Sequence, residues 1–330
     1  MAEPALPTPR GEVSEAVIDA LAADRPVPST VDRALDPYGE DLQLALYCLY
    51  ELHYRGFAGV DAEREWDLAL LTLRRELEEI FLGAVRAECP AGADVDAEIE
   101  GLLDEPPDAW GVSHHLRRHG ELWQLREYVV HRSLYHLKEA DPQAFVIPRL
   151  EGAAKAGVVT VEHDEYGAGD PRRVHAQLFA DLMQALDLCA DYGHHLDAVP
   201  APVLAEVNFM SFAGLHRRWR GALVGQFAVV ELTSSPGSDR LAKALRRLGV
   251  DAEFYDEHVE ADAVHEQLVR RDVIAPLVAA EPALAADVVF GMRASTMLGD
   301  RFGEFLLDRW AAGRSSLRTP LPDAPLAVHR

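Results

Sequence analysis

The chain has 330 residues, 48% of them hydrophobic, so it is long enough to bury a substantial core. It carries 55 Asp and Glu residues against 32 Lys and Arg residues, which gives a formal net charge of −23 at pH 7. Such a charge repels phosphate backbones and anionic bilayers over most of the surface, which argues against nucleic-acid and membrane partners.

The cysteines and the hydropathy pattern favour a protein of the reducing cytoplasm. Cys48, Cys89 and Cys189 are too few and too scattered for a disulfide framework or a thiolate metal site. We find no apolar run of transmembrane length and no apolar segment typical of a signal peptide. We expect a single domain over residues 1–330, with loosely held ends at about 1–10 and 319–330, where prolines interrupt any periodicity.

Between these ends the local preference is helical almost throughout, because Ala, Leu, Glu and Arg dominate and β-type alternation is rare. We therefore predict an all-α protein. The predicted helices cover residues 12–23, 38–55, 62–87, 121–140, 145–165, 171–188, 200–212, 215–232, 239–248 and 254–271, followed by a helical hairpin over 282–313. Residues 114–119 are predicted to form a solvated connector.

The predicted helix 254–271 carries a pattern typical of metal ligands. His258, Asp262 and His265 stand at i, i+4 and i+7, which places two imidazoles and a carboxylate on one stripe. A metal ion needs several such donors converging on one point. The alternative is a solvated acidic helix face, formed with the neighbouring Glu257, Glu260 and Glu266.

A metal site on this stripe needs further donors from facing helices. Glu139, Glu165 and His175 lie near predicted helix ends, so tight helical connections would bring them to similar heights in a bundle. Glu231 follows an apolar run, where a carboxylate requires a cation or a proton.

Three segments carry a resemblance to a known family: Tyr135–Pro142, Asp164–Gly167 together with His175, and His258–His265. Over roughly residues 121–271 the chain resembles the heme-oxygenase-like diiron oxidases and oxygenases, which are iron-containing redox enzymes. The resemblance implies a heme-oxygenase-like multi-helix bundle with two iron ions. The ligands that it implies are Glu139, Glu165, His175, His258, Asp262 and His265, with Glu231 as an additional carboxylate candidate. Gln226 stands where several relatives lead us to expect a histidine.

The resemblance further implies a non-heme diiron oxidase or oxygenase that activates O₂, its co-substrate, with Fe(II)/Fe(III) and an external electron donor. Implied substrates are amines, amino acids or fatty acids, and implied outcomes are N-oxygenation, C–C cleavage or oxidative decarboxylation. Two alternatives stay open: a non-catalytic α-bundle that binds heme or another small molecule, and a helical interaction protein. The oligomeric state stays open, although many bundles of this kind pair through helix faces as homodimers. The basic segment 216–220 is expected to form intramolecular salt bridges rather than to bind a substrate carboxylate.

Overall fold

The computed structural model describes residues 3–23, 25–90 and 92–321, and all regular structure in these ranges is helical, as predicted. The α-helices are α1 (Glu12–Ala23), α2 (Glu40–Glu51), α3 (Leu68–Glu88), α4 (Val95–Leu103), α5 (Val112–Arg118), α6 (Leu122–His136), α7 (Asp141–Ala144), α8 (Gly152–Glu165), α9 (His175–Ala185), α10 (Ala201–Leu215), α11 (Arg220–Arg247), α12 (Glu253–Leu268), α13 (Ala275–Ala280) and α14 (Ala285–Ala311). A π-helix spans Val269–Ile274, and 3₁₀ turns span Ala62–Trp66, Ile147–Arg149, Gly167–Gly169, Leu196–Ala198, Arg217–Trp219 and Pro282–Leu284.

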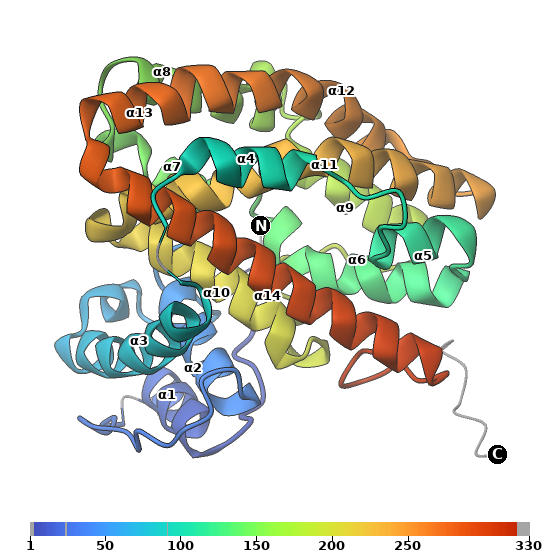
Figure 1. The fold of residues 1–330 in the computed structure, drawn as a ribbon. Helices are drawn as coiled ribbons and strands as arrows, with labels where there is room; N and C mark the ends of the chain where they lie inside the picture. Colours follow the sequence, from blue (N-terminus) through green and yellow to red (C-terminus); the bar gives the residue numbers. More distant parts are fainter. Residues whose placement is uncertain (1–2, 24, 91, 322–330) are drawn as a thin grey trace.

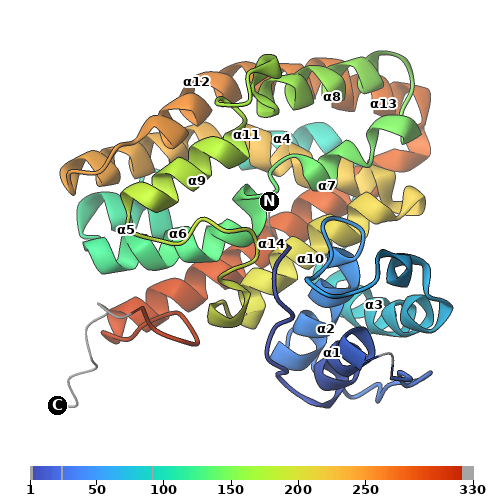
Figure 2. The ribbon, with the colours of Figure 1, turned by 180° about the vertical axis from the view of Figure 1, so that it is seen from behind.

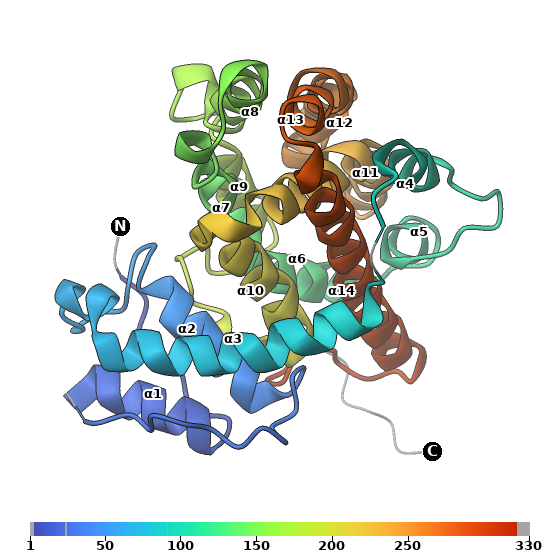
Figure 3. The same ribbon diagram turned by 60° about the vertical axis from the view of Figure 1, so that its left-hand side comes forward.

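The bundle is built around α11, which packs along α14 on one side and α12 on another (Figure 1). The line formed by α12, the π-helix and α13 runs along one edge, and α8 lies beside it (Figure 3). Seen from behind, α9 lies between α12 and α6 (Figure 2). Helices α1–α3 gather at one end, where α2 packs on α10 and α3 on α14.

Two glycines allow α11 and α14 to approach closely. A Cβ atom added at Gly225 would overlap the carbonyl oxygen of Val288, and one added at Gly291 would overlap that of Ala222. The two helices therefore pack backbone against backbone, which no larger side chain at these positions permits.

Proline does not interrupt the helices where the sequence suggested. The predicted helices 215–232 and 239–248 form the single helix α11, which continues through Pro236. That proline removes one backbone hydrogen bond, but buried residues on both sides of it hold the helix against the bundle. The π-helix similarly leads into Pro276, because its wider hydrogen-bonding register accommodates the missing donor.

Several other predicted boundaries are wrong. Within residues 282–313 a 3₁₀ turn leads into the one long helix α14 instead of a hairpin, and α8 begins at Gly152 rather than at Phe145. The predicted helix 62–87 is split at Asp67, whose side chain caps α3 by accepting from the amides of Ala69 and Leu70. Residues 114–118 of the predicted connector belong to the helix α5.

The N-terminal segment is held more firmly than the sequence suggested. Pro4 and Pro7 are buried, and the Pro4 carbonyl accepts from the amide of Ala58 at 2.8 Å. Thr8 donates to the carboxylate of Asp197 through both its amide and its hydroxyl. In contrast to the prediction of a loose end at about 1–10, residues 3–10 pack against the body. Most of the predicted C-terminal loose segment, 322–330, lies outside the described residues.

No single helix among the described residues is both long and apolar enough to cross a membrane. One bent pair, Glu253–Ala280 with Pro282–Ala311, passes such a test together on length and composition only.

Because α11 and α14 cross closely, the effect of a glycine-to-alanine substitution on the free energy of unfolding should depend strongly on its position. Gly225→Ala and Gly291→Ala should each lower the free energy of unfolding by about 3 kcal/mol, because the new methyl group overlaps a backbone carbonyl. Gly299→Ala, also within α14, meets no neighbour within 4 Å and should raise it by about 0.5–1 kcal/mol. Urea unfolding of the three variants measures the difference, and equal effects at the three positions would contradict the close crossing.

Candidate metal centre

The seven candidate ligands converge from five parts of the chain, and all seven are buried. Glu139 lies in the turn after α6, Glu165 is the last residue of α8, and His175 is the first residue of α9. Glu231 lies within α11, and α12 supplies the stripe of His258, Asp262 and His265.

The turn that carries Glu139 is anchored by a buried ion pair. The ammonium of Lys138 lies 3.1 Å from an oxygen of Glu51, and the Tyr192 hydroxyl donates to the same carboxylate. Ala140, on the other side of Glu139, has the left-handed φ of 72°. Such a backbone conformation is costly for alanine and persists only where the surroundings impose it. The anchored turn thereby fixes the direction of the Glu139 side chain.

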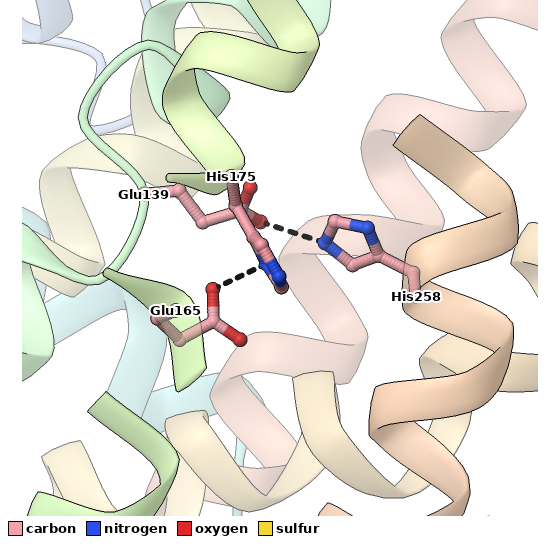
Figure 4. A group of neighbouring side chains, drawn as sticks. All are labelled: Glu139, Glu165, His175 and His258. Carbon is pink, nitrogen blue, oxygen red and sulfur yellow. Dashed lines mark ion pairs between the residues drawn. The ribbon is translucent and has the colours of Figure 1, made fainter. Parts of the chain in front are cut away.

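The first group of donors is formed by Glu139, Glu165, His175 and His258, whose candidate ligand atoms all lie within 4.8 Å of one another. Figure 4 shows these side chains pointing toward one another from separate elements. His175 Nδ1 lies 2.8 Å from a Glu165 oxygen, and His258 Nε2 lies 3.6 Å from a Glu139 oxygen.

The second group is formed by Glu165, Glu231, Asp262 and His265, again within 4.8 Å of one another. His265 Nδ1 lies 3.0 Å from Glu231, 3.7 Å from Asp262 and 4.0 Å from Glu165. Glu165 belongs to both groups. The arrangement is therefore two adjacent candidate sites that share one carboxylate.

Neighbouring groups orient the imidazoles. His258 Nδ1 donates to the carbonyl oxygen of Phe254 at 2.7 Å, which leaves Nε2 facing the site. His265 Nε2 lies 3.2 Å from an oxygen of Asp164, which leaves Nδ1 facing the site. Such partners fix the ring orientation and the tautomer of histidine ligands.

The electrostatics of the site show an excess of negative charge that retains protons. Burial raises the pKa of Glu231 to about 8, and the charges of Asp262 and Glu165 add to this effect. Burial alone would lower the pKa of His258, but the charge of Glu139 and its other acidic neighbours raise it to about 10. Burial likewise lowers the pKa of His265, whereas its bonds to Asp262 and Glu231 raise it to about 11.

The donor set fits two divalent metal ions. Glu139 Oε2, Glu165 Oε2, His175 Nδ1, His258 Nε2 and Asp262 Oδ2 are buried and have no hydrogen-bond partner among the described residues. Unpartnered buried polar atoms are costly, and a cation bound among these converging atoms would satisfy them. The four carboxylates of the two groups balance the charge of two divalent ions. Mixed carboxylate and imidazole ligation suits iron.

The three glutamates beside the ligand stripe do not join the donor groups. Only these glutamates, and not the buried stripe itself, lie toward solvent or toward surface partners. Glu257 pairs with Arg173, Glu260 is exposed, and Glu266 lies 3.6 Å from Arg270.

The basic segment 216–220, after α10, makes intramolecular contacts, as expected. His216 pairs with Glu78, Arg218 with Asp287 and Arg220 with Glu281.

Sequence reasoning missed several residues around the centre. His136 Nδ1 lies 2.7 Å from Glu139, and Asp164 contacts His265, yet each is merely the neighbour of a polar residue in the sequence. Glu162 is buried one helical turn before Glu165. Its i−3 spacing from Glu165 was a usable signal, because residues three apart share a helix face. Gln226, noted in the sequence, is fully buried and accepts a hydrogen bond from Gln143.

The fold and the donor groups together describe a helical-bundle protein with two adjacent candidate sites built from carboxylates and imidazoles. A family model described as "Iron-containing redox enzyme" matches residues 126–300, just over half of the chain, and this segment contains all seven candidate ligands. The chain belongs to this family of iron-containing redox enzymes and has its heme-oxygenase-like fold. The predicted resemblance to iron-containing redox enzymes of heme-oxygenase-like fold is thereby confirmed. A search of curated proteins finds no match to the chain.

The raised pKa values of His258 and His265 predict metal binding that strengthens with pH. In the metal-free protein these values are about 10 and 11, against an ordinary 6.5, so the protonated rings stabilise the fold below pH 6.5. That contribution is lost as the pH rises through 10 and 11. A metal ion must displace these protons, so its apparent affinity should rise about tenfold per pH unit for each proton released.

Anaerobic Fe(II) titrations between pH 6.5 and 8, in buffers of different ionisation enthalpy, measure both the affinity and the number of protons released. An affinity that does not change over this range would contradict the placement of His258 and His265 at the metal.

Proposed function

We propose that the protein is a non-heme diiron oxidase or oxygenase that activates O₂ to oxidise a small organic substrate. The observation that carries this proposal is Glu165, which belongs to both donor groups and can bridge two ions. A single axial histidine would suffice for heme, whereas these donors are arranged as two sets of four. Membership of the iron-containing redox enzymes supports the choice of iron.

In this proposal each half of the site holds one ion. Glu139, His175 and His258 hold the first, and Glu231, Asp262 and His265 hold the second, with Glu165 between them. Two iron ions held by these residues would supply electrons for the reduction of O₂, and an external electron donor would restore those electrons. Carboxylate ligands tolerate the change between Fe(II) and Fe(III).

The surrounding side chains exclude water from one side of the centre. The rings of Phe179 and Phe254 pack 4.8 Å and 5.0 Å from that of His136, and Phe254 packs 4.3 Å from His258. An apolar wall of this kind strengthens the electrostatic interactions inside it and protects reactive species from solvent.

The substrate classes proposed are amines, amino acids and fatty acids, with N-oxygenation, C–C cleavage or oxidative decarboxylation as outcomes. The cytoplasmic location, the electron donor and the pairing of two copies stay predictions.

Removal of one ligand imidazole tests the proposal. The wild-type protein should bind about two iron ions per chain, whereas His265→Ala should lose the second ion and slow O₂ consumption by about 100-fold or more, because its ring contacts three carboxylates of that site. His194→Ala, at an exposed position, is the matched control. Iron analysis and O₂ electrode measurements are the readouts.

Unchanged iron content and O₂ consumption in His265→Ala would contradict the diiron assignment. A Soret band that appears on addition of one equivalent of heme, together with no iron bound without heme, would favour the heme-binding alternative.

A further inference from the structure

The ammonium group of Lys138 occupies a buried site formed by α2 and the residues that follow it. It lies 3.1 Å from a carboxylate oxygen of Glu51, and the two side chains are each 1% exposed. It also lies 4.1 Å from the ring centroid of Tyr54 and 5.1 Å from that of Tyr47. A carboxylate and two aromatic rings attract an ammonium group, and the attraction strengthens where water is removed. This site therefore holds the Lys138 side chain in one place.

Two further contacts hold the same part of the chain. The Tyr192 hydroxyl donates to the Glu51 carboxylate, at 2.7 Å and 2.8 Å from its two oxygens. The guanidinium group of Arg55 donates to the carbonyl oxygen of Leu137 at 3.2 Å. Residues 51–55 thus bind the two consecutive residues that precede Glu139, one through its side chain and one through its backbone.

The turn that carries Glu139 depends on these contacts because its own hydrogen bonding is weak. Helix α6 ends at His136, and the amide of Glu139 donates to the His136 carbonyl at a long 3.4 Å. Ala140, the next residue, has the costly left-handed φ of 72°. Local structure alone therefore does not fix the position of Glu139.

The residues that support this turn come from outside the segment that matches the family. That segment covers residues 126–300, whereas Glu51 is the last residue of α2 and Arg55 follows it closely. Glu139 belongs to the first donor group and not to the second. The support from α2 therefore reaches only one of the two candidate sites directly.

We propose that Glu51 and Lys138 are positioning residues for one metal ion of the pair. Their contact holds Glu139 where it meets His175 and His258, and it thereby sets the affinity of the first ion but not that of the second. This inference rests on the two-ion site of the proposed function, but not on the reaction with O₂. The ion pair has no net charge, so its effect on the metal arises from geometry.

The test measures each ion separately. His265→Ala retains the first ion, and His175→Ala retains the second. In each background Glu51→Gln and Lys138→Met are introduced together, because removal of one partner alone leaves a buried charge unpaired. Anaerobic Fe(II) titrations should show the first ion bound about 10- to 100-fold more weakly, and the second ion bound with unchanged affinity.

A second ion pair on α6 provides the matched control. Arg132 lies 2.8 Å from Glu206, and their side chains are 23% and 14% exposed. Arg132→Met with Glu206→Gln removes this pair and should leave the affinity of both ions unchanged. Mössbauer spectra of the iron-loaded proteins give an independent readout. Loss of the Glu51–Lys138 pair should change the quadrupole splitting of the first ion and not that of the second.

Tyr192→Phe covers the case in which the paired replacement does not fold. It removes only the hydroxyl that donates to Glu51, and it should weaken binding of the first ion by about three- to tenfold without an effect on the second. Equal weakening of both ions in a folded variant would overturn the inference, since a general loss of stability acts on both sites. So would wild-type affinity for the first ion in the folded Glu51→Gln/Lys138→Met protein.

The two proposals fail in different ways. Two bound iron ions without O₂ consumption would reject the oxidase assignment, and a selective loss of the first ion would still support the positioning role. Two bound iron ions with O₂ consumption, and no effect of the paired replacement, would leave the enzyme assignment in place and reject the positioning role. Absent iron binding in the wild-type protein would reject both.

Discussion

The convergence of buried carboxylates at the centre of the bundle is the constraint on which the rest of the structure depends. Glu139, Glu165, Glu231 and Asp262 repel one another in a region from which water is largely removed. Protons on His258 and His265 relieve part of this repulsion, as their raised pKa values show. Divalent ions would relieve it more fully, since each ion carries twice the charge of a proton and binds several ligand atoms at once. The polypeptide therefore has to hold like charges together before any cation arrives.

Close packing away from the centre supplies that rigidity. Gly225 and Gly291 bring the backbones of α11 and α14 into contact. Gly157 does the same for α8 and the π-helix, because a Cβ atom there would meet Val273 and the Asp272 carbonyl. The first contact fixes the helix that carries Glu231, and the second fixes α8, which ends at Glu165, against the continuation of the ligand stripe. The acids cannot separate without disturbing packed backbones, which interiors resist.

How far the sequence predicts this arrangement depends on whether a feature is local. The stripe on α12 follows from helical periodicity, and the spacing of Glu165 and His175 is part of a family pattern, so the candidate ligands were found without coordinates. The continuation of α11 through Pro236 was missed, because buried contacts on both sides outweigh a local breaker. Lys138 also gave no local signal, since its partner Glu51 is 87 residues away in the chain.

Helix α8 carries a second buried acid close to the candidate metal centre. Glu162 and Glu165 are three residues apart, so they share a face and are separated by a rise of about 4.5 Å along the axis. Glu165 belongs to both donor groups, whereas Glu162 belongs to neither. Burial raises the pKa of Glu162 to about 9, and the charge of Glu165 adds to this effect, so Glu162 retains its proton at neutral pH. One helix thereby combines a candidate ligand with a buried acid that stays neutral.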